Sequence, residues 1–170
     1  MTRQVVISDR DAAAWLRRLR ADPTAPPPTP DEVTAASVAR VPPTSARAGK
    51  RADLDGLYVR SAWEANFARY LNYLQAHGQI TRWAYEPETF DFPVRRGPAS
   101  FYTPDFKVWE PDGRVVYYEV KGWLSPTGAA KLRRFAKYYP ALRLIVVDAD
   151  AYHALARDVA ALIPEWEHNR

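Results

Sequence analysis

Two acidic residues and a lysine lie in a part of the sequence that is otherwise rich in apolar residues. They are Asp105, Glu119 and Lys121, and the segment Glu110-Pro111-Asp112-Gly113-Arg114 separates the two acids. Its proline, aspartate and glycine suit a type I turn followed by a left-handed residue, which makes a three-residue hairpin loop. This turn predicts that Glu110 pairs with Arg114. The same register sets Asp105 directly opposite Glu119.

The predicted hairpin brings the three side chains onto one face. Directly opposed residues have Cβ atoms roughly 4.5–5.5 Å apart, and Lys121 shares the face of Glu119 because it lies two residues farther along the strand. Two carboxylates this close repel and raise each other's pKa unless a cation lies between them. Mg²⁺ prefers one or two carboxylates together with water and phosphate oxygens, and a lysine can orient a water beside a phosphate. The pattern therefore indicates Mg²⁺-dependent phosphodiester hydrolysis, with Mn²⁺ as a substitute.

A surface hairpin with a cross-strand ion pair is the alternative interpretation of the same residues. Two details favour the chemical one. Apolar residues such as Phe106, Val108 and Val120 flank the carboxylates in sequence, and a charge in apolar surroundings is costly. Pro104 directly precedes Asp105, and a proline within a strand usually marks an edge or an irregularity.

These residues also resemble a known family. Thr103-Pro104-Asp105 followed by Glu119-Val120-Lys121 is similar to the signature of the PD-(D/E)XK nuclease superfamily. Asp55-Gly56-Leu57-Tyr58-Val59-Arg60-Ser61-Ala62-Trp63-Glu64-Ala65 looks like a motif of its small phage-encoded members. The layout resembles phage endonuclease I and archaeal-type Holliday-junction resolvases over a little more than half of the chain.

The resemblance implies a role for each site residue. Asp105, Glu119 and the Val120 carbonyl would bind the metal, and Lys121 would position the attacking water. Glu64 would support a second metal or the water network. Ser61 and Glu64 also form a capping box, which explains Glu64 structurally, so both interpretations of Glu64 stay open. The products would carry 5′-phosphate and 3′-hydroxyl ends.

The composition fits a globular DNA-binding protein. The chain has 170 residues, of which 47% are hydrophobic and 26% charged, enough for one domain with a sizeable core. A net charge of +4 permits nucleic-acid binding. The chain has no cysteine, which excludes disulfides and thiolate metal sites, and its three histidines are scattered, which argues against zinc. The residues predicted to contact DNA are Arg47, Lys50, Arg51, Arg60, Arg95, Arg96, Lys131 and Arg134.

Residues 1–54 are predicted to form an N-terminal extension to a nuclease domain at 55–170. The extension contains a short helix with Trp15, which packs on the core or contacts a partner, and a proline-rich spacer at 22–30. The basic stretch that follows is either a DNA-contacting lead-in or a solvated linker. Neither a signal peptide nor a membrane-spanning run is evident, which predicts a cytoplasmic protein, in the host cytoplasm if phage-encoded.

The predicted fold class is α/β, with a restriction-endonuclease-like core. A mixed, mainly four-stranded sheet is expected from residues 80–92, 100–109, 114–121 and 142–148, with flanking helices at 61–77 and 126–139 and a last helix at 149–163. A strand, a helix and a strand in succession predict a parallel crossover at the end of the chain.

The predicted function is a metal-dependent DNA endonuclease that selects for DNA structure in the manner of a Holliday-junction resolvase. Its partner would be duplex or branched DNA, and cutting two opposed strands of a junction would require a homodimer. Two alternatives are a non-catalytic DNA-binding module that keeps the nuclease fold and a general nicking or repair nuclease. A structural phage protein with a fortuitous motif is a third.

Overall fold

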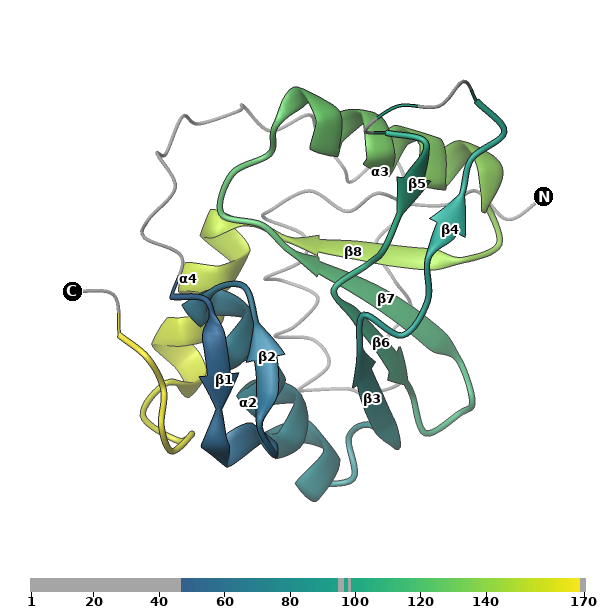
Figure 1. Cartoon of the computed structure of the whole chain (residues 1–170). Helices are drawn as coiled ribbons and strands as arrows, with labels where there is room; N and C mark the ends of the chain where they lie inside the picture. Colours follow the sequence, from purple (N-terminus) through teal and green to yellow (C-terminus); the bar gives the residue numbers. More distant parts are fainter. Residues whose placement is uncertain (1–46, 95–96, 98, 169–170) are drawn as a thin grey trace.

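The central element of the protein is a mixed four-stranded sheet (Figure 1). The computed structural model describes residues 47–94, 97 and 99–168. The strand order is β3-β6-β7-β8, made of β3 (Arg82–Tyr85), β6 (Phe106–Trp109), β7 (Val115–Val120) and β8 (Arg143–Val147). Only β8 runs parallel to its neighbour, and helix α3 (Pro126–Tyr138) connects it to β7. The predicted α/β class, mixed sheet and parallel crossover are therefore confirmed.

The helices cover both faces of this sheet (Figure 1). Alternate residues of β7 face opposite ways. Val116, Tyr118 and Val120 lie in the core cluster formed with α2 (Ala62–Ala76), whereas Tyr117 belongs to the cluster formed with α3. By the same alternation Glu119 lies on the α3 face. Helix α4 (Ala149–Val159) packs into the α2-side core.

Serine caps start two of the helices. Ser61 accepts a hydrogen bond from the Glu64 amide at 3.1 Å and starts α2. Ser125 accepts one from the Gly128 amide at 3.0 Å and starts α3, with proline at its first position. The last helix, α4, ends at Val159, so the predicted end at residue 163 is wrong. Ile163 and Trp166 beyond it are buried in the core instead.

Two predicted strands are each broken in two. Residues 80–92 form β3 and then β4 (Phe90–Asp91), because the chain turns at Glu86, which has a φ of 42°, and Pro87 follows it. Residues 100–109 form β5 (Phe101–Tyr102) and then β6, with Pro104, which has no N–H to donate, between them. Strands β4 and β5 pair as a separate two-stranded sheet.

A second hairpin lies at the start of the described chain. Strand β1 (Gly49–Arg51) pairs with β2 (Leu57–Val59) across a 3₁₀ turn, η2 (Ala52–Leu54). Leu54 is buried in the main core. The domain boundary predicted at residue 55 therefore falls inside this hairpin, because Leu54 and β1 pack as part of the same unit. The predicted helix containing Trp15 and the proline-rich spacer lie outside the described residues.

An ion-pair network ties this hairpin to α2 and to the C-terminal segment. Glu167 pairs with Arg51 at 2.6 Å and with Arg69 at 3.0 Å, and Arg69 also pairs with Asp53 at 2.7 Å. Burial opposes ionisation of Glu167, but the two arginines outweigh it and hold its pKa below the ordinary value. The network therefore stabilises the fold with Glu167 ionised.

Replacing Glu167 by glutamine is expected to lower the free energy of unfolding at pH 7 by about 1–3 kcal/mol. The ionised Glu167 stabilises the fold at any pH above the ordinary glutamate pKa of about 4.3. This stabilisation is lost as the pH falls through the lower pKa that Glu167 has in the folded state. The difference in the free energy of unfolding between Glu167→Gln and wild type should therefore shrink below about pH 4. Urea unfolding at pH 7 and pH 3.5 measures it, with Glu165→Gln, an exposed neighbour, as the control. A difference that persists unchanged at pH 3.5 would contradict this account.

Candidate active site

Asp105 and Glu119 lie where β6 begins and β7 ends. The hairpin turn forms as expected: the Glu110 amide donates to the Arg114 carbonyl at 2.9 Å, and Gly113 has a φ of 85°. The ladder runs from Trp109 paired with Val115 to Phe106 paired with Tyr118. The next residues in the same register are Asp105 and Glu119. The predicted register is confirmed.

The Asp105 carboxylate is almost completely buried, with 2% of the residue exposed. Its Oδ2 accepts a hydrogen bond from the Val120 amide at 2.8 Å, and its Oδ1 lies 3.1 Å from an Arg60 nitrogen. Burial, followed by repulsion from Glu119 and Glu64, raises the pKa of Asp105 far above its ordinary value. Three carboxylates thus act on one another here, and a bound divalent cation would relieve their repulsion.

Both carboxylate oxygens of Glu119 have a partner. Its Oε1 lies 2.8 Å from the Lys121 Nζ, and its Oε2 accepts a hydrogen bond from the Tyr102 hydroxyl at 2.8 Å. Burial and the Glu119 charge raise the pKa of Tyr102 well above normal, so this hydroxyl remains a donor. Burial favours the neutral form of Lys121, but Glu119 outweighs it and the pKa of Lys121 is raised. Lys121 is therefore a cation at neutral pH and suits a charge-stabilising role better than that of a base.

The Glu64 carboxylate contacts the start of α2, where it bonds the Arg60 amide in place of the Ser61 amide of a capping box, and it also acts on the site. Its Oε1 accepts from the Ser61 hydroxyl at 3.0 Å, and its Oε2 accepts from the Arg60 amide at 3.0 Å and the Tyr85 hydroxyl at 2.6 Å. Glu64 is buried and still contributes to the raised pKa of Asp105. The capping and the acidic-site interpretations of Glu64 are compatible in this structure.

The strand that carries Lys121 is packed directly onto α2. A Cβ placed on Gly122 would lie 3.0 Å from the Trp63 ring, so a larger residue here would require the ring to shift by a few tenths of an ångström. Trp63 in turn stacks on Tyr152 of α4, with ring centroids 4.1 Å apart. This contact fixes the end of β7 against the start of the helix that carries Glu64.

The donor set fits a small divalent cation. Within residues 47–94, 97 and 99–168, no three acidic or histidine side chains form a group that could hold a metal ion by themselves. Mg²⁺ does not need such a group, because it takes one or two carboxylates and fills its other positions with carbonyl, water and phosphate oxygens. Asp105, Glu119 and the Val120 carbonyl could supply that set.

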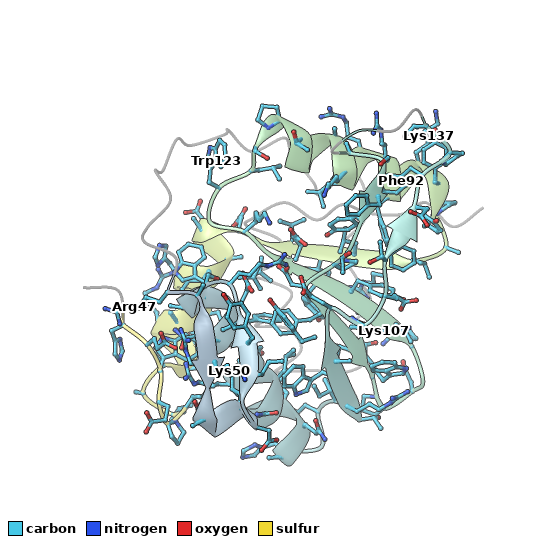
Figure 2. The ribbon with its side chains drawn as sticks, viewed as in Figure 1. Arg47, Lys50, Phe92, Lys107, Trp123 and Lys137 are labelled. Carbon is cyan, nitrogen blue, oxygen red and sulfur yellow. The ribbon has the colours of Figure 1, made fainter. Side chains whose placement is uncertain are left out.

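The cations predicted to contact DNA have different surroundings. Arg51 forms an ion pair with Glu167. Arg47 and Lys50 are exposed at the β1–β2 hairpin (Figure 2). Lys131 lies 4.8 Å from the centre of the Phe101 ring, and Arg134 donates to the Ala99 carbonyl. Arg95 and Arg96 lie outside the described residues.

Sequence reasoning missed two tyrosines at the site, Tyr85 and Tyr102. Each donates its hydroxyl to one of the acidic residues. Tyr102 lies three residues before Asp105, but the strand break at Pro104 removes the alternation that could have placed it. No signal in the sequence separates it from the other tyrosines of the chain.

The fold and the site together define an α/β protein with a buried carboxylate pair and a lysine at the end of its central sheet. The chain belongs to a family described as Protein of unknown function (DUF1064), whose model matches residues 45–154. All four candidate catalytic residues fall inside that range. Comparisons with curated proteins and with solved structures give no match. No helix in the described part of the chain is long and apolar enough to cross a bilayer.

Proposed function

We propose that the protein is a metal-dependent DNA endonuclease with a restriction-endonuclease-like core of the PD-(D/E)XK type. The observation that carries the proposal is the buried pair Asp105 and Glu119 with Lys121 beside it. Ionising Asp105, whose pKa is raised, is costly for a purely structural hairpin, and strongly perturbed ionisable groups cluster at functional sites.

Each residue has a role that follows from its contacts. Asp105 and Glu119, with the Val120 carbonyl, would hold Mg²⁺ or Mn²⁺. The bound ion would supply Lewis-acid stabilisation of the phosphate and a more acidic water. Tyr102 fixes the orientation of Glu119, and the Val120 amide fixes that of Asp105. Lys121 would stabilise the negative charge that develops on the phosphate, and Glu64 would accept a hydrogen bond from the attacking water.

Exposed aromatic residues support a nucleic-acid substrate with unpaired bases. Tyr58, Phe101 and Trp123 are 55%, 47% and 44% exposed. Two of them have a cation nearby: Tyr58 pairs with Lys50 across the β1–β2 hairpin, and Phe101 lies under Lys131. Aromatic rings next to cations bind single strands by stacking on bases while the cations contact phosphates. This pattern favours branched DNA over uniform duplex.

The experiment that tests the function is cleavage of a labelled DNA panel. The substrates are supercoiled plasmid, linear duplex, single strand, flap and four-way junction, each with Mg²⁺, Mn²⁺ or EDTA. We expect cleavage with either metal, none with EDTA, and faster cleavage of the branched substrates. Paired symmetric nicks at the junction would indicate a resolvase acting as a homodimer. Binding of DNA without cleavage under any metal would instead establish a non-catalytic DNA-binding module.

A further inference from the structure

Arg60 is the cation that links the candidate metal site to the protein surface. It lies between β2 and Ser61, the residue that caps α2. More than half of its side chain, 56%, is exposed, yet one of its terminal nitrogens lies 3.1 Å from Oδ1 of the buried Asp105. The same nitrogen is bound by Glu86, and the Arg60 Nε is 4.0 Å from Glu64. Burial opposes the charge on Arg60, but Glu86 and Asp105 outweigh it and raise its pKa.

The second partner, Glu86, is held in an unusual conformation. It has a φ of 42°, which is rare for any residue other than glycine, and proline follows it, which restricts the backbone further. Its amide donates to the Asp105 carbonyl at 2.8 Å. Backbone strain of this kind persists where the surrounding structure imposes it, and it is concentrated at functional sites. In this conformation the Glu86 carboxylate lies next to the Arg60 guanidinium.

The two partners of Arg60 differ in freedom. Asp105 is buried and fixed by the Val120 amide, whereas the Glu86 side chain is 32% exposed. A guanidinium on Oδ1 of Asp105 and a divalent cation on the same carboxylate would repel each other strongly at this distance. Arg60 can leave Asp105 without losing its other ion pair. Because it is exposed, it can move without repacking the core.

We infer that Arg60 is the counter-ion of the metal-free site and that, when a divalent cation binds Asp105, it gives up its contact with Asp105 and keeps Glu86 as its partner. This inference rests on the proposed function. Once released from Asp105, the guanidinium remains beside the site on Glu86, where its planar fork can donate two hydrogen bonds to a phosphate. Arg60 is therefore a substrate-positioning residue whose availability depends on the metal.

The test measures the affinity for Mn²⁺ alone, by electron paramagnetic resonance, in Arg60→Gln, Glu86→Gln and the double variant. Arg60→Gln should bind Mn²⁺ about tenfold more tightly than wild type, since no charged hydrogen bond has to be broken. Glu86→Gln should bind it about threefold more weakly, because Arg60 then has Asp105 as its main partner. In the Arg60→Gln background the Glu86→Gln change should have no effect. Arg82→Gln, which removes an equal charge from the face of Trp109, should match wild type.

The outcomes separate the two proposals. Equal affinities in wild type and Arg60→Gln would overturn the counter-ion role and leave the endonuclease standing. An equal loss of Mn²⁺ affinity from Glu86→Gln with and without Arg60→Gln would show that Glu86 attracts the metal directly. That result would overturn the inference that Glu86 acts by drawing Arg60 away from Asp105. Absence of Mn²⁺ binding in every variant would overturn the metal site and the proposed function together. Arg60→Gln should also cleave DNA more slowly despite its tighter metal binding, and Arg60→Lys should recover part of that rate.

Discussion

Lys121→Ala is expected to reduce DNA cleavage by at least about 10²–10³-fold while leaving DNA binding nearly unchanged. Lys121 is held 2.8 Å from Glu119, and its raised pKa keeps it charged. A preorganised cation in a partly buried site stabilises the charge that develops in the transition state more than it stabilises the bound substrate. The loss should therefore fall on the rate constant of the chemical step. Single-turnover cleavage and a binding titration in Ca²⁺ separate the two quantities.

The matched control for this variant is Lys137→Ala. Lys137 is an exposed lysine in the last turn of α3 and lies over the Tyr138 ring (Figure 2), whereas Lys121 precedes the start of that helix. The Lys137→Ala variant should cleave DNA at the wild-type rate. Retained cleavage by Lys121→Ala would eliminate the assigned mechanism, and an equal loss of binding and cleavage would make Lys121 a DNA contact only.

Asp105→Asn is expected to abolish cleavage and to make the metal-free protein more stable. The raised pKa of Asp105 means that the folded chain ionises this group reluctantly. Because the pKa of Asp105 is higher in the folded chain than in the unfolded chain, the free energy of unfolding falls as the pH rises from the ordinary aspartate pKa of about 3.9 through the pKa of the folded state. Asparagine removes that cost and keeps an oxygen for the Val120 amide. In EDTA at pH 8 we expect a midpoint roughly 3–6 °C above that of wild type.

Added Mg²⁺ should reverse the order of stability. A ligand at a hundred times its Kd stabilises the folded state by about 2.7 kcal/mol, and only wild type would gain it fully. Thermal unfolding with EDTA and with Mg²⁺ checks both parts, and Asp91→Asn, an exposed residue of β4, is the control. A lower midpoint for Asp105→Asn in EDTA would mean that the contact with Arg60 outweighs the repulsion from Glu119 and Glu64.

The hairpin was predictable because its turn chemistry is local. Pro111, Asp112 and Gly113 determine the loop, and the loop determines which residues face each other. The break between β3 and β4 was not predictable from periodicity. Apolar residues continue on both sides of Glu86 and Pro87, so Pro87 indicates an irregular or edge strand, and the positive φ at Glu86 shows where the chain turns.

The surroundings of the basic residues were equally hidden from the sequence. Arg51 and Arg60 are both arginines of the β1–β2 region, yet one is committed to Glu167 and the other to Asp105 and Glu86. The difference depends on partners that are distant in the chain. The local sequence pattern therefore located the acidic pair and Lys121. It could not distinguish a structural cation such as Arg51 from a cation at the site such as Arg60.

The ion-pair network of Glu167 with Arg51 and Arg69 also bears on the order in which the molecule is assembled. Glu167 follows Arg51 by 116 positions and Arg69 by 98. A chain growing on the ribosome therefore carries Asp105, Glu119 and Lys121 well before the carboxylate that fastens the β1–β2 hairpin is made. Until then the hairpin that leads into Arg60 is held by Leu54 in the core and by the ion pair between Asp53 and Arg69. Glu167 thus adds its ion pairs with Arg51 and Arg69 after every residue of the candidate site has been made.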